Sequence, residues 1–398
     1  MKKLLLGTAL SAVTATAALA ASHSNEVKLG IILGFTGPIE SLTPLMAASA
    51  ELAMKEVSDS GALLGGATVT PVRADSTCVD AAAATAGAER LITSDGVKGI
   101  MGADCSGVTG AVLANVAVPN GIVMISPSAT SPALSAAEDN GLFFRTSPSD
   151  ARQGQVLADV LVERGITTVA LSYTNNDYGK GLADSFEAAF KAAGGSVTLS
   201  TAHEDGKADY SAEVGALASA GGDALVVAGY VDQGGPGIIR AALDTGAFDT
   251  FVLPDGMIGA ALETTFGDEI DGSFGTLPGT DSEGAGMMLE MAEAAGFTGN
   301  SPYVGESYDA AALIMLAMQA AGSAEPADYK GKVFDVANAP GEPIYPGELA
   351  KALKILAEGG EIDYVGATAV ELIGPGESAG SYKEIEIKGG KIETVAYR

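Results

Sequence analysis

The chain has few of the residue types on which enzyme active sites and metal centres most often depend. Its 398 residues include two histidines, two cysteines and no tryptophan. His23 lies near the N-terminus, and His203 lies in the polar stretch AHEDGKADY, which we expect to be an exposed loop. A zinc site of cysteine and histidine would therefore lack ligands, and a Ser–His–Asp triad would depend on His203. We predict neither an enzyme nor a metal or cofactor site.

Basic residues are also scarce. Lysine and arginine total 22 against 50 aspartate and glutamate residues, so the formal net charge is −28. Such a chain repels nucleic-acid phosphates and anionic lipid, so we predict no nucleic-acid partner. The hydrophobic content of 47% and charged content of 18% predict a folded protein, not a disordered one. Net acidity does not itself select a ligand, because the local field of a site can oppose it.

The N-terminus has the pattern of a secretory signal peptide. Lys2 and Lys3 precede an apolar run that ends in the small residues Ala18-Leu19-Ala20, which predicts a signal over residues 1–20. A retained membrane anchor is the weaker alternative, because the run is short for a membrane span. No cysteine stands at the cleavage site, so a lipid anchor is not indicated there. We therefore expect export to the periplasm.

The two cysteines, Cys78 and Cys105, are read first as one disulfide, because the predicted compartment is oxidising. Closing a loop of this length would stabilise the fold by roughly 3–4 kcal/mol in the chain-entropy description. Redox catalysis is the weaker alternative, because no CxxC motif occurs.

Apolar strands alternate with helical segments through two consecutive blocks, with a change near residues 145–149. The first strand, VKLGIILG, is almost continuously apolar, as in a parallel sheet buried on both faces. An alternating order of strands and helices predicts parallel sheets with helices on both sides. The expected strands are 27–34, 67–74, 97–102 and 122–126 in the first block, and 167–173, 196–201, 224–229 and 250–253 in the second.

The rest of the chain is expected to be helical and then β-rich. Helices are predicted over residues 284–295, 304–322, 326–336 and 345–358, and short strands over 367–372, 382–387 and 391–397. The length is sufficient for two domains, each with its own core.

Polar and aromatic residues follow the predicted strands, where open α/β sheets bind ligands. In the first block Ser106 opens a helix after a Gly-rich turn, and Ser128 and Thr130 lie in a proline-stiffened loop. Helix N-terminal N–H groups favour anions, although a plain helix cap at Ser106 is the more frequent alternative. In the second block Tyr178, Tyr230 and Asp255 follow strands, and Asp255 could pair with an ammonium group.

These residues lie in motifs that resemble the periplasmic receptors for branched-chain (leucine/isoleucine/valine) amino acids, which serve ABC importers. The resemblance spans the mature chain and is carried by VKLGIILGFTGPIE, DCSGVTGAV, ISPSATSPAL, FFRTSPSDARQG, YTNNDYGKGLADSF, VVAGYVDQGG, LPDG and GESYDAAALIMLAM. It implies an α/β fold of the type I periplasmic binding class, with two Rossmann-like lobes, parallel sheets, three crossovers and a ligand cleft between the lobes. Lobe 1 would hold residues 26–145 and 279–359, and lobe 2 residues 146–278 and 360–398.

The resemblance also implies a ligand-binding set and a disulfide. Hydroxyl and N–H groups at Ser106 and Thr130 would bind an α-carboxylate, the backbone at Ser128 would accept from an α-ammonium, and Asp255 would pair with that ammonium. Tyr178 and Tyr230 would cover the ligand. The implied set is therefore Ser106, Ser128, Ala129, Thr130, Tyr178, Tyr230 and Asp255, with a disulfide between Cys78 and Cys105 in lobe 1.

The expected function is that of a non-enzymatic, monomeric receptor for an aliphatic or branched-chain amino acid. The receptor would deliver this ligand to the membrane permease of an ABC importer. The alternative is a receptor of the same fold for an amide, urea or aromatic acid. Two departures from the family bear on this choice. Many members have glutamate in place of Asp255, and many have an aromatic residue where this chain has Ser41-Leu42. Glu306 and Tyr308 are expected to be structural or to lie at the edge of the cleft.

Overall fold

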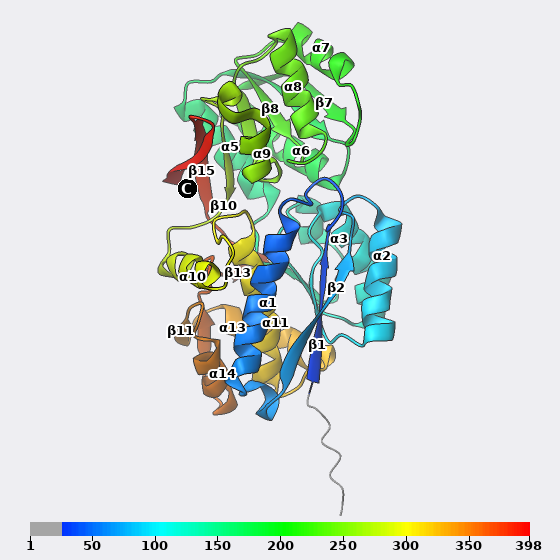
Figure 1. The fold of residues 1–398 in the computed structure, drawn as a ribbon, viewed down its shortest axis with the longest axis vertical. Coiled ribbons are helices and arrows are strands. Elements are labelled where there is room, and N and C mark those ends of the chain that lie inside the picture. The colour runs from blue at the N-terminus through cyan, green and yellow to red at the C-terminus, as the bar shows by residue number, and fades with distance from the viewer. Residues whose placement is uncertain (1–25) are drawn as a thin grey trace, which may run out of the picture.

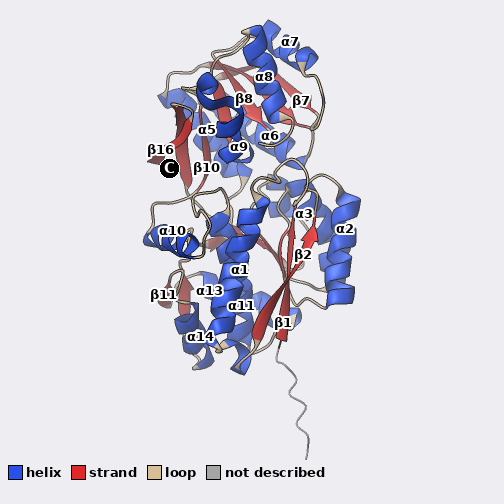
Figure 2. Ribbon diagram, in the orientation of Figure 1, coloured by secondary structure: helices blue, strands red, loops and turns tan. Residues whose placement is uncertain are grey.

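The computed structural model describes residues 26–398, so the predicted signal peptide lies outside the described residues. The chain forms two lobes, each built around a seven-stranded sheet. Figure 2 shows each sheet enclosed between helices. The two mostly parallel sheets and the two-lobed arrangement confirm the predicted fold class.

Lobe 1 contains the first sheet, in which β1 lies between β2 and β3 and pairs with both in parallel. β1 is an apolar strand with a buried interior because helices cover both faces of its sheet. In spatial order the strands are β13 (Leu372–Ile373), β14 (Glu377–Ser378), β5 (Phe143–Arg145), β4 (Met124–Ser126), β3 (Ile100–Gly102), β1 (Glu26–Leu33) and β2 (Thr68–Asp75).

The helices of lobe 1 come from both ends of the chain. α11 is buried over most of its length and packs against α1, so residues far apart in sequence share one core. Beside them β11 (Glu342–Ile344) and β12 (Ile362–Tyr364) form a separate pair. The helices are α1 (Thr43–Ser60), α2 (Ala81–Arg90), α3 (Ser106–Val112), α4 (Val118–Asn120), α10 (Glu283–Ala294), α11 (Val304–Ala321), α12 (Pro326–Tyr329), α13 (Val333–Ala337) and α14 (Leu349–Ala357).

Lobe 2 has the same architecture, but most of its elements come from one continuous stretch of the chain. Its strands, in spatial order, are β16 (Lys391–Tyr397), β15 (Tyr382–Lys388), β10 (Phe274–Pro278), β9 (Phe251–Pro254), β8 (Ala224–Ala228), β6 (Thr168–Thr174) and β7 (Ser196–His203). Its helices are α5 (Asp150–Glu163), α6 (Asp177–Ala192), α7 (Ser211–Ala220), α8 (Gly235–Thr245) and α9 (Ala260–Phe266).

The C-terminal tail divides between the lobes differently from our expectation. We assigned residues 360–398 to lobe 2, but β13 and β14 extend the first sheet, and only β15 and β16 join the second. β14 is attached because Glu377 pairs with Arg145 both through the strand register and through an ion pair of 2.5 Å. A long-range charge pair of this kind leaves no periodic signal in the sequence.

Three elements at the lobe junction were not predicted from the sequence, namely β5, α5 and β10. α5 starts where the chain enters lobe 2, with the Ser149 hydroxyl accepting from the N–H of Ala151 as the helix cap. β10 ends where the chain leaves lobe 2, next to the crossover at residues 278–282. The third connection runs from β14 to β15.

The disulfide predicted from the cysteine count is present. Cys78, after β2, is bonded to Cys105, after β3, with a Cα–Cα distance of 5.1 Å. It joins two turns at the carboxyl end of the first sheet, the edge that faces lobe 2.

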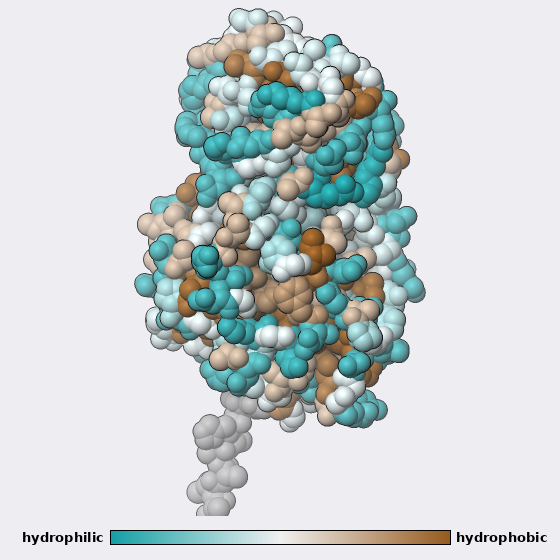
Figure 3. All heavy atoms as spheres, turned by 180° about the vertical axis from the view of Figure 1, so that it is seen from behind, coloured by the Kyte–Doolittle hydropathy of each residue, from teal (hydrophilic) through white to brown (hydrophobic). Residues whose placement is uncertain are grey.

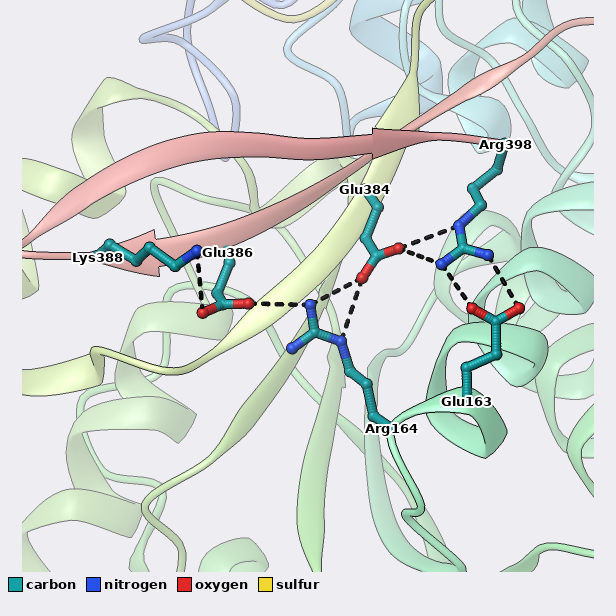
Figure 4. A network of polar contacts seen from close by, with 6 residues as sticks. All are labelled: Glu163, Arg164, Glu384, Glu386, Lys388 and Arg398. Carbon is teal, nitrogen blue, oxygen red and sulfur yellow. Dashed lines mark hydrogen bonds and ion pairs between the residues drawn. The ribbon is translucent and has the colours of Figure 1, made fainter.

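The end of the chain is fastened by a network of charges on lobe 2 (Figure 4). Arg164 and Arg398 both donate to Glu384, at 2.7 Å and 2.5 Å, and Arg398 also pairs with Glu163 of α5. Arg164 lies over the ring of Phe274, 4.1 Å from its centre. Burial would raise the pKa of Glu384, but the two arginines hold it below its ordinary value. The network therefore ties β15 and the C-terminus to α5.

The face shown in Figure 3 carries a mixture of hydrophilic and apolar residues over both lobes. Within residues 26–398 no helix combines the length and apolar character needed to cross a bilayer.

Replacing Glu384 with Gln should lower the free energy of unfolding by about 2–4 kcal/mol, because two arginines lose their shared partner in a largely buried position. Urea denaturation at neutral pH measures this. The Glu384 contribution is present above its unfolded pKa and is lost as the pH falls through its lower folded pKa, so the difference should vanish in acid. Asp59→Asn, in the exposed Lys55–Asp59 pair, is the control and should cost less than about 1 kcal/mol.

Replacing Cys78 and Cys105 with Ala should lower the free energy of unfolding by roughly 3–4 kcal/mol, because the 27-residue separation is no longer closed in the unfolded chain. A reductant should destabilise the parent protein by a similar amount and leave the double variant unaffected. Equal stability of the two proteins under oxidising conditions would contradict this role.

Candidate functional site

A small cavity lies between the carboxyl ends of the two sheets. Five of the seven predicted ligand-binding residues border it: Ser106 and Ser128 from lobe 1, and Tyr178, Tyr230 and Asp255 from lobe 2. Its other lining residues are Ile39, Leu42, Asp104, Cys105, Gly256 and Tyr303. The fold therefore brings residues from 39 to 303 together at the point predicted from strand-end positions.

Asp255 is a buried carboxylate held from both lobes. It follows β9, whose four residues are all buried, so the strand delivers the side chain to the interlobe edge. The Tyr178 hydroxyl donates to Oδ1 at 2.8 Å, and the Tyr303 hydroxyl of lobe 1 donates to Oδ2. Burial raises the pKa of Asp255, and these hydrogen bonds offset part of that rise. The next residue must be glycine, because a Cβ at Gly256 would lie 2.6 Å from the Gly229 carbonyl.

The two predicted tyrosines form one aromatic wall. The rings of Tyr178 and Tyr230 stack with centroids 5.2 Å apart. The Tyr230 hydroxyl accepts from Asn176 Nδ2 at 3.3 Å, and the N–H of Gly256 donates to the Tyr178 hydroxyl at 3.1 Å. Both tyrosines thus present an apolar face while their polar ends stay bonded inside lobe 2.

Arg145 shapes the lobe 1 loop that carries three predicted residues. Its guanidinium, almost fully buried, donates to the carbonyls of Ala129 at 2.9 Å and Ser131 at 3.0 Å. The Ala129 N–H donates to Ser126 Oγ at 3.0 Å. Both backbone groups of Ala129 are therefore used within the protein, and Ala129 does not border the cavity, so it is left out of the proposed set.

The hydroxyl groups of Ser106, Ser128 and Thr130 in lobe 1 differ in the hydrogen bonds that they already make within the protein. Ser106 lies in the first turn of α3, after the cap residue Cys105, and its Oγ accepts from the Ser131 N–H at 3.1 Å. Ser128 Oγ donates to the Asp104 carbonyl at 3.1 Å. Thr130 Oγ1 is buried beside the Asp150 carboxylate, which it stabilises, and makes no other hydrogen bond in the described chain. Thr130 lies outside the cavity wall, although Ser128 of the same loop borders it.

A second buried carboxylate accompanies Asp255. Asp150 opens α5 at the lobe junction, is fully buried, and has neither carboxylate oxygen bonded within the described chain. Burial and the negative charge of Asp255 raise its pKa well above the ordinary value, and the adjacent Thr130 hydroxyl and the charge of Arg145 counteract this only in part. Because Arg145 is already paired with Glu377, the two aspartates form a region with excess negative charge.

Among the residues of the wall that the sequence interpretation missed, two have polar side chains, Asp104 and Tyr303. Asp104 accepts from the Gly34 N–H at 2.6 Å and from Ser76 Oγ at 2.8 Å, so it fixes the turns around the cavity. Tyr303 has a left-handed backbone with φ of 62°, which is unfavourable for a tyrosine. No local motif marks this position, because its role depends on Asp255 of the opposite lobe.

His203 was expected in an exposed loop, which is wrong. It ends β7 and is 1% exposed, with Nδ1 hydrogen-bonded to Ser172 Oγ at 2.8 Å. Burial lowers its pKa to about 4. The stretch Gly376–Gly380 matches the letters G-x-S-x-G, but it is a strand leading to the third crossover, not the strand–turn–helix of a nucleophile elbow. Within residues 26–398 no group of three potential metal ligands is found.

Comparison with known proteins gives consistent matches. A relative from Brucella suis, described as Leu/Ile/Val-binding protein homolog 1, is 30% identical over 82% of this chain and 86% of its own length. A Leucine-, isoleucine-, valine-, threonine-, and alanine-binding protein from Pseudomonas aeruginosa is 28% identical over 76% of this chain and 80% of its own.

Solved structures share the fold. The leucine-binding protein LivK from Thermotoga maritima superposes with a TM-score of 0.78 at 21% identity, covering 93% of this chain and 98% of that one. A solute-binding protein from R. palustris in complex with benzoate gives 0.74 at 19% identity, covering 94% and 96%.

A family model described as periplasmic binding protein matches residues 26–336. The two-lobed fold, the interlobe cavity and this match agree, and the chain belongs to the periplasmic binding protein family, whose members are non-enzymatic ligand receptors.

Proposed function

We propose that this protein is a periplasmic receptor for a small aliphatic amino acid, which it delivers to the permease of an ABC importer. The names of the relatives from Brucella suis and Pseudomonas aeruginosa support amino-acid binding. The observation that carries the proposal is Asp255, a buried carboxylate at an interlobe cavity with a second unpaired carboxylate, Asp150, close behind it.

Charge balance favours a ligand with an ammonium group. Two buried aspartates repel each other, which raises both the free energy of the site and the pKa of Asp150. A ligand ammonium would neutralise this excess at Asp255 and would receive charge-assisted hydrogen bonds in a dry cleft. The Ser128 carbonyl is our proposed second acceptor for the ammonium.

The opposite end of the ligand would be held by lobe 1. We assign the α-carboxylate to the hydroxyl groups of Ser106 and Thr130, the latter buried beside Asp150. The stacked rings of Tyr178 and Tyr230 would cover the ligand from lobe 2. Since each lobe supplies one half of the polar contacts, ligand binding would favour hinge closure.

A receptor for an amine-free aromatic acid is the second candidate, and the neighbour bound to benzoate favours it. Such a ligand would bring a further negative charge to Asp255 and Asp150. The aromatic candidate therefore requires one of these aspartates to be protonated, whereas the amino-acid candidate does not.

Replacing Asp255 with Asn should weaken L-leucine binding by about 1.5–3 kcal/mol, or roughly 10- to 150-fold, because a charge-assisted hydrogen bond is lost. Calorimetric titration of the protein, unfolded and refolded to remove carried-over ligand, measures this. Asp184→Asn, an exposed residue of α6 on the same lobe, is the matched control and should bind like the parent. Equal affinity of parent and Asp255→Asn would contradict the assignment, and binding of benzoate but not leucine would support the second candidate.

Leucine affinity should fall as the pH is lowered, because the ligand ammonium needs the ionised form of Asp255. Burial raises the pKa of Asp255, so this fall should begin at a higher pH than it would for a solvent-exposed aspartate. The free energy of unfolding of the unliganded protein should instead gain from the protonation of Asp255. A carboxyl with a raised folded pKa stabilises the fold at low pH, and this contribution is lost as the pH rises through that pKa. Titrations and thermal unfolding from neutral pH to about pH 4 test both signs, and parallel trends would contradict the argument.

A further inference from the structure

A second and larger cavity lies beside the hinge. It has a volume of about 530 Å³, within the range of small-molecule sites. Lobe 1 contributes α10 and the start of α11, lobe 2 contributes β15 and β16, and the crossover at residues 278–282 forms part of the wall. These elements meet at the junction of the lobes (Figure 1).

The hinge cavity is distinct from the proposed amino-acid cavity. The two share Leu42 and Tyr303, which separate them, while Ile39 borders only the amino-acid cavity and Ile385 and Ile392 border only the hinge cavity. The Tyr303 hydroxyl is bonded to Asp255, so the polar end of this partition belongs to the first site.

The hinge cavity wall is made of apolar and polar residues in similar share, and part of it is open to solvent. Leu289 and Tyr397 of this wall are 44% and 43% exposed. Further apolar lining is supplied by Leu45, Met288, Ile385 and Ile392.

Glu306 is the unusual residue of this wall. It is 5% exposed, and its carboxylate makes no hydrogen bond to another residue of the described chain. As the third residue of α11 it could form a capping box with the N–H of Tyr303, but no such bond is present. Burial raises the pKa of Glu306 to about 7, although its own backbone and the charge of Lys383 act against the rise.

Lys383 supplies the opposite charge from lobe 2. It lies on β15, and its ammonium makes no hydrogen bond or ion pair in the described chain. Its aliphatic stem passes over Gly279 of the crossover, where a Cβ would lie 2.5 Å from Lys383 Cε. The glycine thus makes room for the lysine to reach the cavity.

We propose that the hinge cavity is a second binding site, for a zwitterionic small molecule with an apolar body, such as a hydrophobic dipeptide. The ligand ammonium binds Glu306, its carboxylate binds Lys383, and its side chains cover the apolar part of the wall. A buried carboxylate that is bonded only to its own backbone is costly, and a bound ammonium lowers that cost. The proposal does not depend on what the first cavity binds.

The test is a methyl NMR titration of isoleucine-labelled protein with L-leucyl-L-leucine, after saturation with L-leucine. Ile385 and Ile392 report on the hinge cavity and Ile39 on the amino-acid cavity. We expect shifts at Ile385 and Ile392, and affinity weaker by about tenfold or more for the N-acetylated and the C-amidated dipeptide, because each lacks one charge. Unmoved hinge methyls, or equal affinity of all three peptides, would overturn the proposal.

Variants sharpen the same titration. Glu306→Gln and Lys383→Met should each weaken dipeptide binding by about tenfold or more. Glu290→Gln removes a charge from an exposed position of α10 outside the wall and should bind like the parent. Parent affinity in both site variants would overturn the proposal, and the modified peptides keep the test valid if a variant fails to fold. If the Ile39 methyl resonance did not shift on addition of L-leucine, this result would count against the proposed function and not against the hinge-cavity proposal.

Discussion

The buried charge of Asp255 is the constraint on which the arrangement of the two lobes depends. A carboxylate removed from water must be compensated by hydrogen bonds or by a cation. One tyrosine from each lobe, Tyr178 and Tyr303, supplies hydrogen bonds, but neither carries a positive charge. We propose that a ligand ammonium would satisfy the remaining requirement, so that lobe closure and ligand choice would both follow from one electrostatic problem.

The hydrogen bonds of Arg145 explain why the negative charge of Asp150 and Asp255 is not neutralised within the protein. The arginine is buried near the junction, yet its donors are directed to two carbonyls of the 129–131 loop and to Glu377 of β14. It thereby fixes the lobe 1 half of the cleft and attaches the returning chain, instead of neutralising Asp150. A structural cation and an electronegative site can coexist at short range because the geometry of the hydrogen bonds decides which carboxylate is paired.

In the hinge cavity, too, the geometry of the side chains decides which charged groups are paired and which are not. Glu306 and Lys383 come from different lobes and are left without direct partners, while the ion pairs of Glu384, one residue further along, are complete. Adjacent residues of β15 point to opposite faces of the sheet. One face therefore stabilises the C-terminus, and the other presents an available ammonium to a cavity.

The sequence by itself determined the fold class and most of the first site. The strand–helix alternation specified parallel sheets because it is local and periodic. Strand-end positions placed Ser106 and Ser128 on the edge of one sheet, and Tyr178, Tyr230 and Asp255 on the edge of the other. Only the tertiary structure decided the course of the tail, the burial of His203, and the contributions of Asp104, Tyr303 and Asp150. Each of these depends on a partner distant in sequence, for which hydrophobic periodicity carries no signal.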